Sequence, residues 1–98
     1  MEKKDILGSF SKSGKVVIEF FSPDCRPCRT MEPIVEKLSE NISDISVAKV
    51  DVVKEPDLAE DFGIRQVPSF VIIKDGAEVA RRSGTCTFRE MEKFVGLN

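Results

Sequence analysis

Two cysteines separated by two residues stand at the junction between a predicted strand and a predicted helix, and no other feature constrains the fold as strongly. They are Cys25 and Cys28, in the sequence Cys-Arg-Pro-Cys. An apolar run at residues 16–21, broken only by Glu19, precedes them, and a helix-compatible segment at residues 30–40 follows them. Two thiols at this spacing can close a small disulfide ring, and the N-terminus of a helix favours a thiolate. The arrangement therefore points to dithiol–disulfide exchange.

Two other interpretations of the cysteine pair stay open at this point, half of a structural metal site and an inert pair of thiols. A metal site needs further ligands, and the chain offers only Cys86 and carboxylates because it contains no histidine. The lack of histidine also excludes a Cys–His nucleophile pair and acid–base catalysis by histidine. We therefore expect no bound metal.

Length and composition favour one soluble globular domain spanning residues 1–98. The net charge is −2, and no basic stripe suggests a nucleic-acid partner. The charged residues 1–5 are not followed by the apolar segment of a secretory signal, and no stretch approaches membrane-spanning length. Three cysteines, an odd number, argue against the disulfide framework of an exported scaffold. We therefore expect a cytoplasmic protein that does not contact membranes.

The rest of the chain alternates between helical and strand patterns. Helices are predicted at residues 3–12, from Pro27 to a stop at Asn41, and at residues 56–62 and 87–95, and strands are predicted at residues 15–21, 45–53, 69–74 and 78–82. The first strand is nearly all apolar, as is typical of a strand buried on both faces. Gly63 is expected to end the third helix in a left-handed conformation, and Pro33 is expected to kink the second helix. Thr87 and Glu90 fit a capping box at the start of the last helix.

The order of these elements, α-β-α-β-α-β-β-α, predicts an α/β fold. A right-handed crossover through the second helix makes the first two strands parallel. The tight-turn sequence Asp75-Gly76 makes the last two strands antiparallel. The expected architecture is a mixed sheet flanked by helices.

This ordered set of motifs resembles the thioredoxin family over about residues 14–96. The segments that carry the resemblance are residues 17–21 leading into Cys25 and Cys28, Pro33, residues 47–51, residues 62–70 with Pro68, residues 74–76, and the pair Ser83-Gly84. The resemblance implies the thioredoxin fold. Family members usually carry an additional N-terminal strand before the first helix, and we expect this chain to be too short at that end to hold one. We therefore expect a four-stranded sheet with the strand at residues 45–53 on its edge.

The chain departs from the family pattern at three positions of the predicted site. Asp24 stands where the family usually has tryptophan, and Arg26 stands where it usually has glycine. Glu19 replaces the buried aspartate that is usual in the family and is one methylene longer. These changes leave open how the pair's reduction potential and partners differ from those of other members.

The resemblance also implies a role for each residue of the site. Cys25 is expected to be the exposed nucleophile at the helix N-terminus, with a lowered pKa, and Cys28 the more buried resolving thiol. Glu19 is expected to be a buried acid with a raised pKa that moves a proton to or from Cys28. The alternative is that Glu19 faces water. Lys49 could tune this acid or simply be an exposed strand lysine.

A docking surface for substrates is expected around the first cysteine. Pro68 is expected to follow a cis peptide bond with Val67 and to bring the backbone there beside Cys25. The substrate-binding residues would be Asp24, Arg26, Pro27, Val67, Gly84 and Thr85, with Pro23 beside them. Asp24 has a second possible role as the cap of the helix N-terminus. Cys86 could be a third redox thiol or a site of intermolecular disulfides. We favour the interpretation that it is a small, partly buried residue before the last helix.

The predicted function is that of a thioredoxin-like protein-disulfide reductase, a monomer that needs no bound cofactor. Its substrates would be disulfide-containing proteins, and a thioredoxin reductase using a nicotinamide or ferredoxin system would restore the dithiol. Two alternatives remain open from the sequence, a disulfide oxidase or isomerase and a non-catalytic binding module with the same fold.

Overall fold

The computed structural model of the chain describes residues 14–98, and the helix expected at residues 3–12 lies outside them. The elements are β1 (Lys15–Phe21), α2 (Arg26–Asn41), β2 (Ile45–Asp51), α3 (Pro56–Asp61), β3 (Ser69–Lys74), β4 (Ala77–Ser83) and α4 (Phe88–Leu97). Their order and type agree with the prediction. None of these described helices is both long and apolar enough to cross a membrane.

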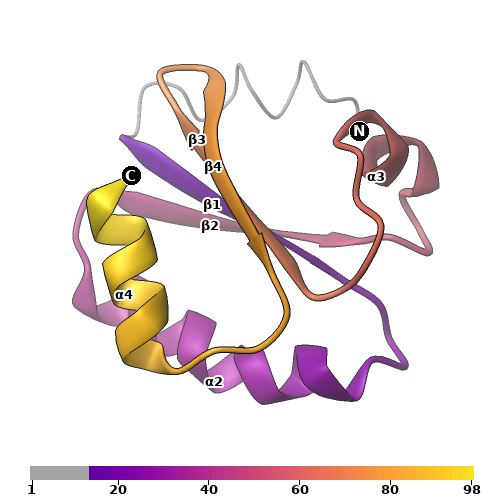
Figure 1. Cartoon of the computed structure of the whole chain (residues 1–98), viewed down its shortest axis with the longest axis horizontal. Helices are drawn as coiled ribbons and strands as arrows, with labels where there is room; N and C mark the ends of the chain where they lie inside the picture. The colour runs from indigo at the N-terminus through magenta and orange to yellow at the C-terminus, as the bar shows by residue number, and fades with distance from the viewer. Residues whose placement is uncertain (1–13) are drawn as a thin grey trace.

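The strands form one mixed sheet in the order β2-β1-β3-β4 (Figure 1). β1 runs parallel to β2 and antiparallel to β3, and β3 runs antiparallel to β4. Within the described part of the chain β2 is therefore an edge strand, as expected. Asp75 and Gly76 both have positive φ, of 54° and 78°, which fits the two-residue turn predicted between β3 and β4.

The second strand is shorter than predicted. β2 ends at Asp51 and not at residue 53. The Asp51 carboxylate accepts hydrogen bonds from the backbone N–H groups of Val53 (2.9 Å) and Lys54 (3.3 Å). An aspartate that bonds the backbone two and three residues ahead turns the chain. The strand therefore stops at Asp51, although the apolar pattern of the sequence continues to residue 53.

The sheet separates two apolar layers. α2 and α4 cover one face, and α3 packs on the other (Figure 1). Alternate residues of β1 supply the two layers, because side chains along a strand point to opposite faces. Val16, Ile18 and Phe20 face α3, and Val17 faces α2 and α4. Glu19, two residues after Val17, therefore belongs to the α2 face.

The expected helix termini are confirmed at two positions. Gly63, just beyond α3, has a φ of +68°. At α4, the Thr87 hydroxyl accepts from the Glu90 N–H (3.1 Å), and the Glu90 carboxylate accepts from the Thr87 N–H (3.0 Å), which completes the capping box. Pro33 lies inside α2 as predicted, and the kink expected there stays a prediction.

Candidate redox site

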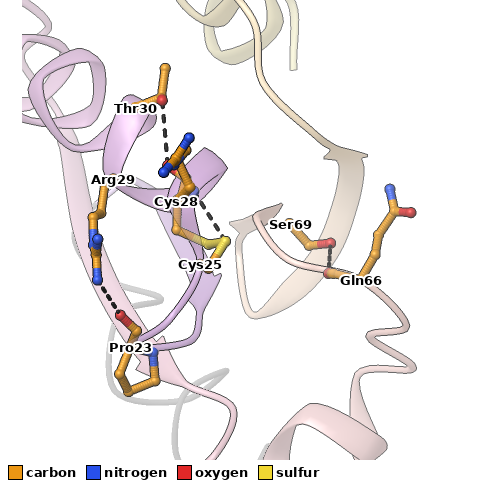
Figure 2. The surroundings of a disulfide bond; sticks show 8 residues. Pro23, Cys25, Cys28, Arg29, Thr30, Gln66 and Ser69 are labelled. Carbon is orange, nitrogen blue, oxygen red and sulfur yellow. Dashed lines mark hydrogen bonds between the residues drawn. A yellow bond between two sulfur atoms is a disulfide. The ribbon is translucent and has the colours of Figure 1, made fainter.

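Cys25 and Cys28 are joined by a disulfide at the N-terminus of α2 (Figure 2). Their Cα atoms are 5.2 Å apart. Cys25 is the N-cap residue of the helix, and its Sγ accepts a hydrogen bond from the Cys28 N–H at 3.1 Å. The first cysteine sulfur thus occupies the place of a capping oxygen, beside the unpaired N–H groups of the first helical turn.

The exposure predicted for the first cysteine is wrong. Cys25 is 8% exposed and Cys28 is 3% exposed. The Cys25 side chain turns back over the first turn of α2, where its sulfur is bonded to Cys28 and receives the N–H hydrogen bond. The expected order, with Cys28 the more buried of the two, is confirmed.

The capping role considered for Asp24 is also wrong, because Cys25 holds the N-cap position. Asp24 is exposed one residue before the helix. The segment before the helix is held in another way, by the Arg29 guanidinium, which donates to the Pro23 carbonyl at 3.1 Å (Figure 2). The Asp24 carboxylate therefore remains accessible to solvent and to a docking partner.

Glu19 is buried in β1, with 1% of its surface exposed. Its Oε1 has no hydrogen-bond partner among residues 14–98. Burial raises the pKa of this carboxyl group, the positive charge of Lys49 opposes that rise, and the negative charge of Glu32 adds to it. The interpretation of Glu19 as a water-facing residue is therefore wrong.

A small cavity joins the buried acid to the second cysteine. It has a volume of about 90 Å³ and is lined by Glu19 and Cys28 together with Glu32 and Lys49. A cavity of this volume with carboxyl and ammonium groups in its wall can hold water. Lys49 is exposed, as one interpretation of this lysine expected. It also stands opposite Glu19 in the β1–β2 register, as the interpretation as a tuning residue requires.

The turn before β3 and the loop after β4 are held together. The Val67–Pro68 peptide bond is cis, as expected. The Gly84 N–H donates to the Pro68 carbonyl at 2.8 Å. One residue further, the Ser69 and Ser83 hydroxyls are 2.9 Å apart, and Ser69 also donates to the Gln66 carbonyl at 2.7 Å. In Figure 2 this turn faces the sulfur of Cys25.

The residues expected to bind substrate differ in accessibility. Those with exposed side chains are Asp24, Arg26, Pro27 and Thr85, and those that are half-buried are Val67 and Gly84. The sequence analysis missed Glu32, which lines the cavity beside Cys28. The available signal was its spacing, because a residue four positions after Cys28 lies on the same face of a helix.

Cys86 is half-buried, and its N–H lies 3.5 Å from the Met31 sulfur of α2. Burial raises the pKa of its thiol, Arg82 lowers it and Glu90 raises it. Its position fits the interpretation as a small, partly buried residue. Within residues 14–98, no group of three or more histidine, cysteine or acidic side chains could hold a metal ion.

Comparisons with known proteins agree with this geometry. The thioredoxin family model matches residues 4–96. A thioredoxin of Aspergillus fumigatus is 38% identical over 90 residues, covering 92% of this chain and 83% of the relative. A thioredoxin of Chlamydia caviae is 37% identical over 78 residues, covering 80% and 76% of the two chains.

Two solved structures extend the likeness to three dimensions. Thioredoxin NaTrxh from Nicotiana alata has a TM-score of 0.85 at 31% identity, with 94% of this chain and 80% of that one covered. The oxidised form of mitochondrial thioredoxin 3 from Saccharomyces cerevisiae has a TM-score of 0.87 at 29% identity, with 96% and 88% covered.

A cysteine pair that closes a disulfide on the first turn of a helix, within this sheet, defines a thiol–disulfide oxidoreductase. Because the family model spans nearly the whole sequence and the relatives exceed a third in identity, the chain belongs to the thioredoxin family. Thioredoxins act on disulfide substrates and are reduced by thioredoxin reductase.

Proposed function

We propose that this thioredoxin-family reductase acts on protein disulfides, with Cys25 as the attacking thiolate and Cys28 as the resolving thiol. The observation that carries the proposal is the Cys25–Cys28 disulfide at the N-terminus of α2. A sulfur at the N-cap lies beside unpaired N–H groups and the positive end of the helix dipole, which stabilise a thiolate. Cys28, three residues later, is more deeply buried, which suits a thiol that attacks only Cys25 Sγ, after the first exchange.

The reaction consists of two exchanges. The Cys25 thiolate attacks one sulfur of the substrate disulfide, and the other substrate sulfur leaves as a thiolate with the electron pair of the broken bond and takes up a proton. The Cys28 thiolate then attacks Cys25 Sγ, and the second substrate sulfur leaves in the same way. The substrate has gained two electrons and two protons, and the protein is left as the Cys25–Cys28 disulfide described above.

Glu19 is the proposed acid–base group for the second exchange. Cys28 must lose its proton before it can attack, and the Glu19 carboxylate shares a small cavity with it. Because burial raises the pKa of Glu19, this group accepts a proton closer to neutral pH than an exposed glutamate does. Lys49 tunes the same group by opposing that rise.

Substrate is proposed to dock across the loops that face Cys25. The proposed contact residues are Asp24, Arg26, Pro27, Val67, Pro68, Gly84 and Thr85. The hydrogen bond from Gly84 to Pro68 supports this surface by holding two of its loops together. Asp24 and Arg26 place exposed charges beside the nucleophile, so we expect partners to be selected by charge more than in members that carry an aromatic residue there.

The remaining expectations are part of the proposal. The protein acts as a single-domain monomer in the cytoplasm, carries electrons without a bound cofactor, and is recharged by a nicotinamide- or ferredoxin-linked reductase. The odd number of cysteines supports a reducing compartment, since one thiol is left without a partner in the chain.

Insulin reduction tests the proposed function directly. With dithiothreitol as the donor, the wild-type protein should accelerate insulin precipitation, and the Cys25→Ser variant should not. The Cys28→Ser variant should instead accumulate a mixed disulfide through Cys25, which gel electrophoresis without reductant detects. An inactive wild-type protein, or a Cys28→Ser variant that traps no substrate, contradicts the assigned function or the assigned roles respectively.

A further inference from the structure

The cavity beside Cys28 is surrounded by more charge than the proposed mechanism uses. Lys49 reaches it from β2, and Arg29 and Glu32 reach it from α2. The neighbour of Glu19 on β3 is Phe70, which carries no charge. The charged and titratable groups that face Glu19 are therefore Lys49 on one strand and Arg29, Glu32 and Cys28 on the helix.

Glu32 is the acidic residue of this set whose side chain both lines the cavity and reaches solvent. It lies four residues after Cys28, so the two side chains share one face of α2. Its side chain is exposed, whereas Glu19 on the opposite wall is 1% exposed. A carboxylate at the surface and a carboxyl group in the interior thus line the same small space.

The cavity lies on a different side of Cys25 from the turn before β3, which is one part of the proposed docking surface. In Figure 2 Arg29 and Pro23, which line the cavity, lie on one side of Cys25, and the turn at Gln66 and Ser69 lies on the other. A substrate seated against that turn leaves the cavity open to water. A proton can therefore leave the region of Cys28 without crossing the substrate.

We propose that Glu32 is a positioning residue for the resolving step, the solvent-side carboxylate of a proton path that runs from Cys28 through Glu19. This inference rests on the proposed function of Glu19. The Cys28 thiol gives its proton to the Glu19 carboxylate, which becomes a carboxylic acid. That proton passes through the cavity to the Glu32 carboxylate and from there to bulk water. No electrons move in these steps, because the electron pair moves only in the disulfide exchange.

Glu32 and Lys49 act on Glu19 in opposite directions. Negative charge at Glu32 favours the protonated form of Glu19, and positive charge at Lys49 favours the ionised form. Removing the charge of Glu32 should therefore let Glu19 ionise at a lower pH.

The test is a titration of the Glu19 carboxyl carbon by ¹³C NMR in the reduced protein. Glu32→Gln should lower the midpoint, and Glu32→Asp, which keeps the charge, should restore it. Glu40→Gln is the matched control, because Glu40 is an exposed acid on the same helix, two turns further from Cys28, and does not line the cavity. The pH profile for resolution of the mixed disulfide by Cys28, in a protein that keeps both cysteines, should move in the same direction as the midpoint.

Two results separate the inference from the function on which it rests. A Glu32→Gln midpoint that moves no further than that of Glu40→Gln, in a wild-type protein that reduces insulin, overturns this inference alone. A midpoint that moves in Glu32→Gln, in a wild-type protein that does not reduce insulin, supports the coupling of the two carboxyl groups and overturns the proposed function.

Discussion

Glu19 sets the stability of the fold against its proposed function. A carboxyl group that is 1% exposed, with one oxygen unpaired among the described residues, disfavours the ionised form. The Glu19 side chain lines the small cavity that Cys28 also lines. A residue whose burial disfavours its ionised form therefore stands where the proposed mechanism needs a proton acceptor.

The burial of Glu19 predicts how stability depends on pH. Its pKa in the folded protein is higher than in the unfolded chain, so between those two values the folded state binds more protons. Stability should therefore fall as the pH rises through this window and become constant above the folded pKa. Glu19→Gln should remove the fall and stabilise the protein at pH 8 by on the order of 1–2 kcal/mol, as measured by urea unfolding at several pH values.

The same Glu19→Gln substitution should slow resolution of the mixed disulfide by Cys28, since Cys28 loses its proposed proton acceptor. Glu92→Gln, at an exposed position of α4, is the control and should change neither property. A Glu19→Gln protein that is as pH-dependent in stability as the wild type would contradict the burial of an ionisable acid at this position.

At the scale of elements, the first turn of α2 and the start of α4 show two different ways to cap a helix. The sulfur of Cys25 caps α2, and a reciprocal pair of side chain and backbone hydrogen bonds caps α4. α4 packs with α2 over one face of the sheet, where Met91 and Val95 join the cluster that contains Met31. The capping box thus stabilises the layer that supports the helix carrying both cysteines.

Thr87→Ala should destabilise the protein by about 1 kcal/mol, the usual effect of losing an N-cap hydroxyl. Thr30→Ala is a matched control, because the Thr30 hydroxyl donates to the Arg26 carbonyl within its own helix, at 3.4 Å, and does not cap a helix end. Urea unfolding of both variants gives the comparison. Equal stability of Thr87→Ala and the wild type would show that the cap does not contribute as described.

Across the whole molecule, the fold was predictable from local patterns, and the details of the site were less so. The buried strand at residues 15–21, the Asp75-Gly76 turn and the Thr87 capping box each follow from neighbouring residues, and all three are confirmed. Burial of Cys25 depends on where its own side chain turns at the helix N-terminus, which the one-dimensional pattern does not encode.

Glu32 and the end of β2 show the same limit at other positions. Glu32 and Glu19 line one cavity because α2 packs on the face of β1 that carries Glu19. This neighbourhood depends on the packing of two elements, which the local sequence pattern does not give. The strand ends at Asp51 because a side chain hydrogen bond turns the backbone, although the apolar residues continue. The chemistry of the cysteine pair was predictable because its two residues, its helix and its strand are contiguous in the sequence.

The reduction potential of the Cys25–Cys28 pair is the most direct test of the account. Equilibration of the pair with glutathione or dithiothreitol redox buffers, read by thiol labelling, gives this value. A disulfide reductase should have a potential at or below the glutathione poise of the cytosol, near the value of roughly −270 mV known for thioredoxin. A potential well above that poise, close to that of a strong oxidant at about −120 mV, would contradict a reductase and identify an oxidase instead.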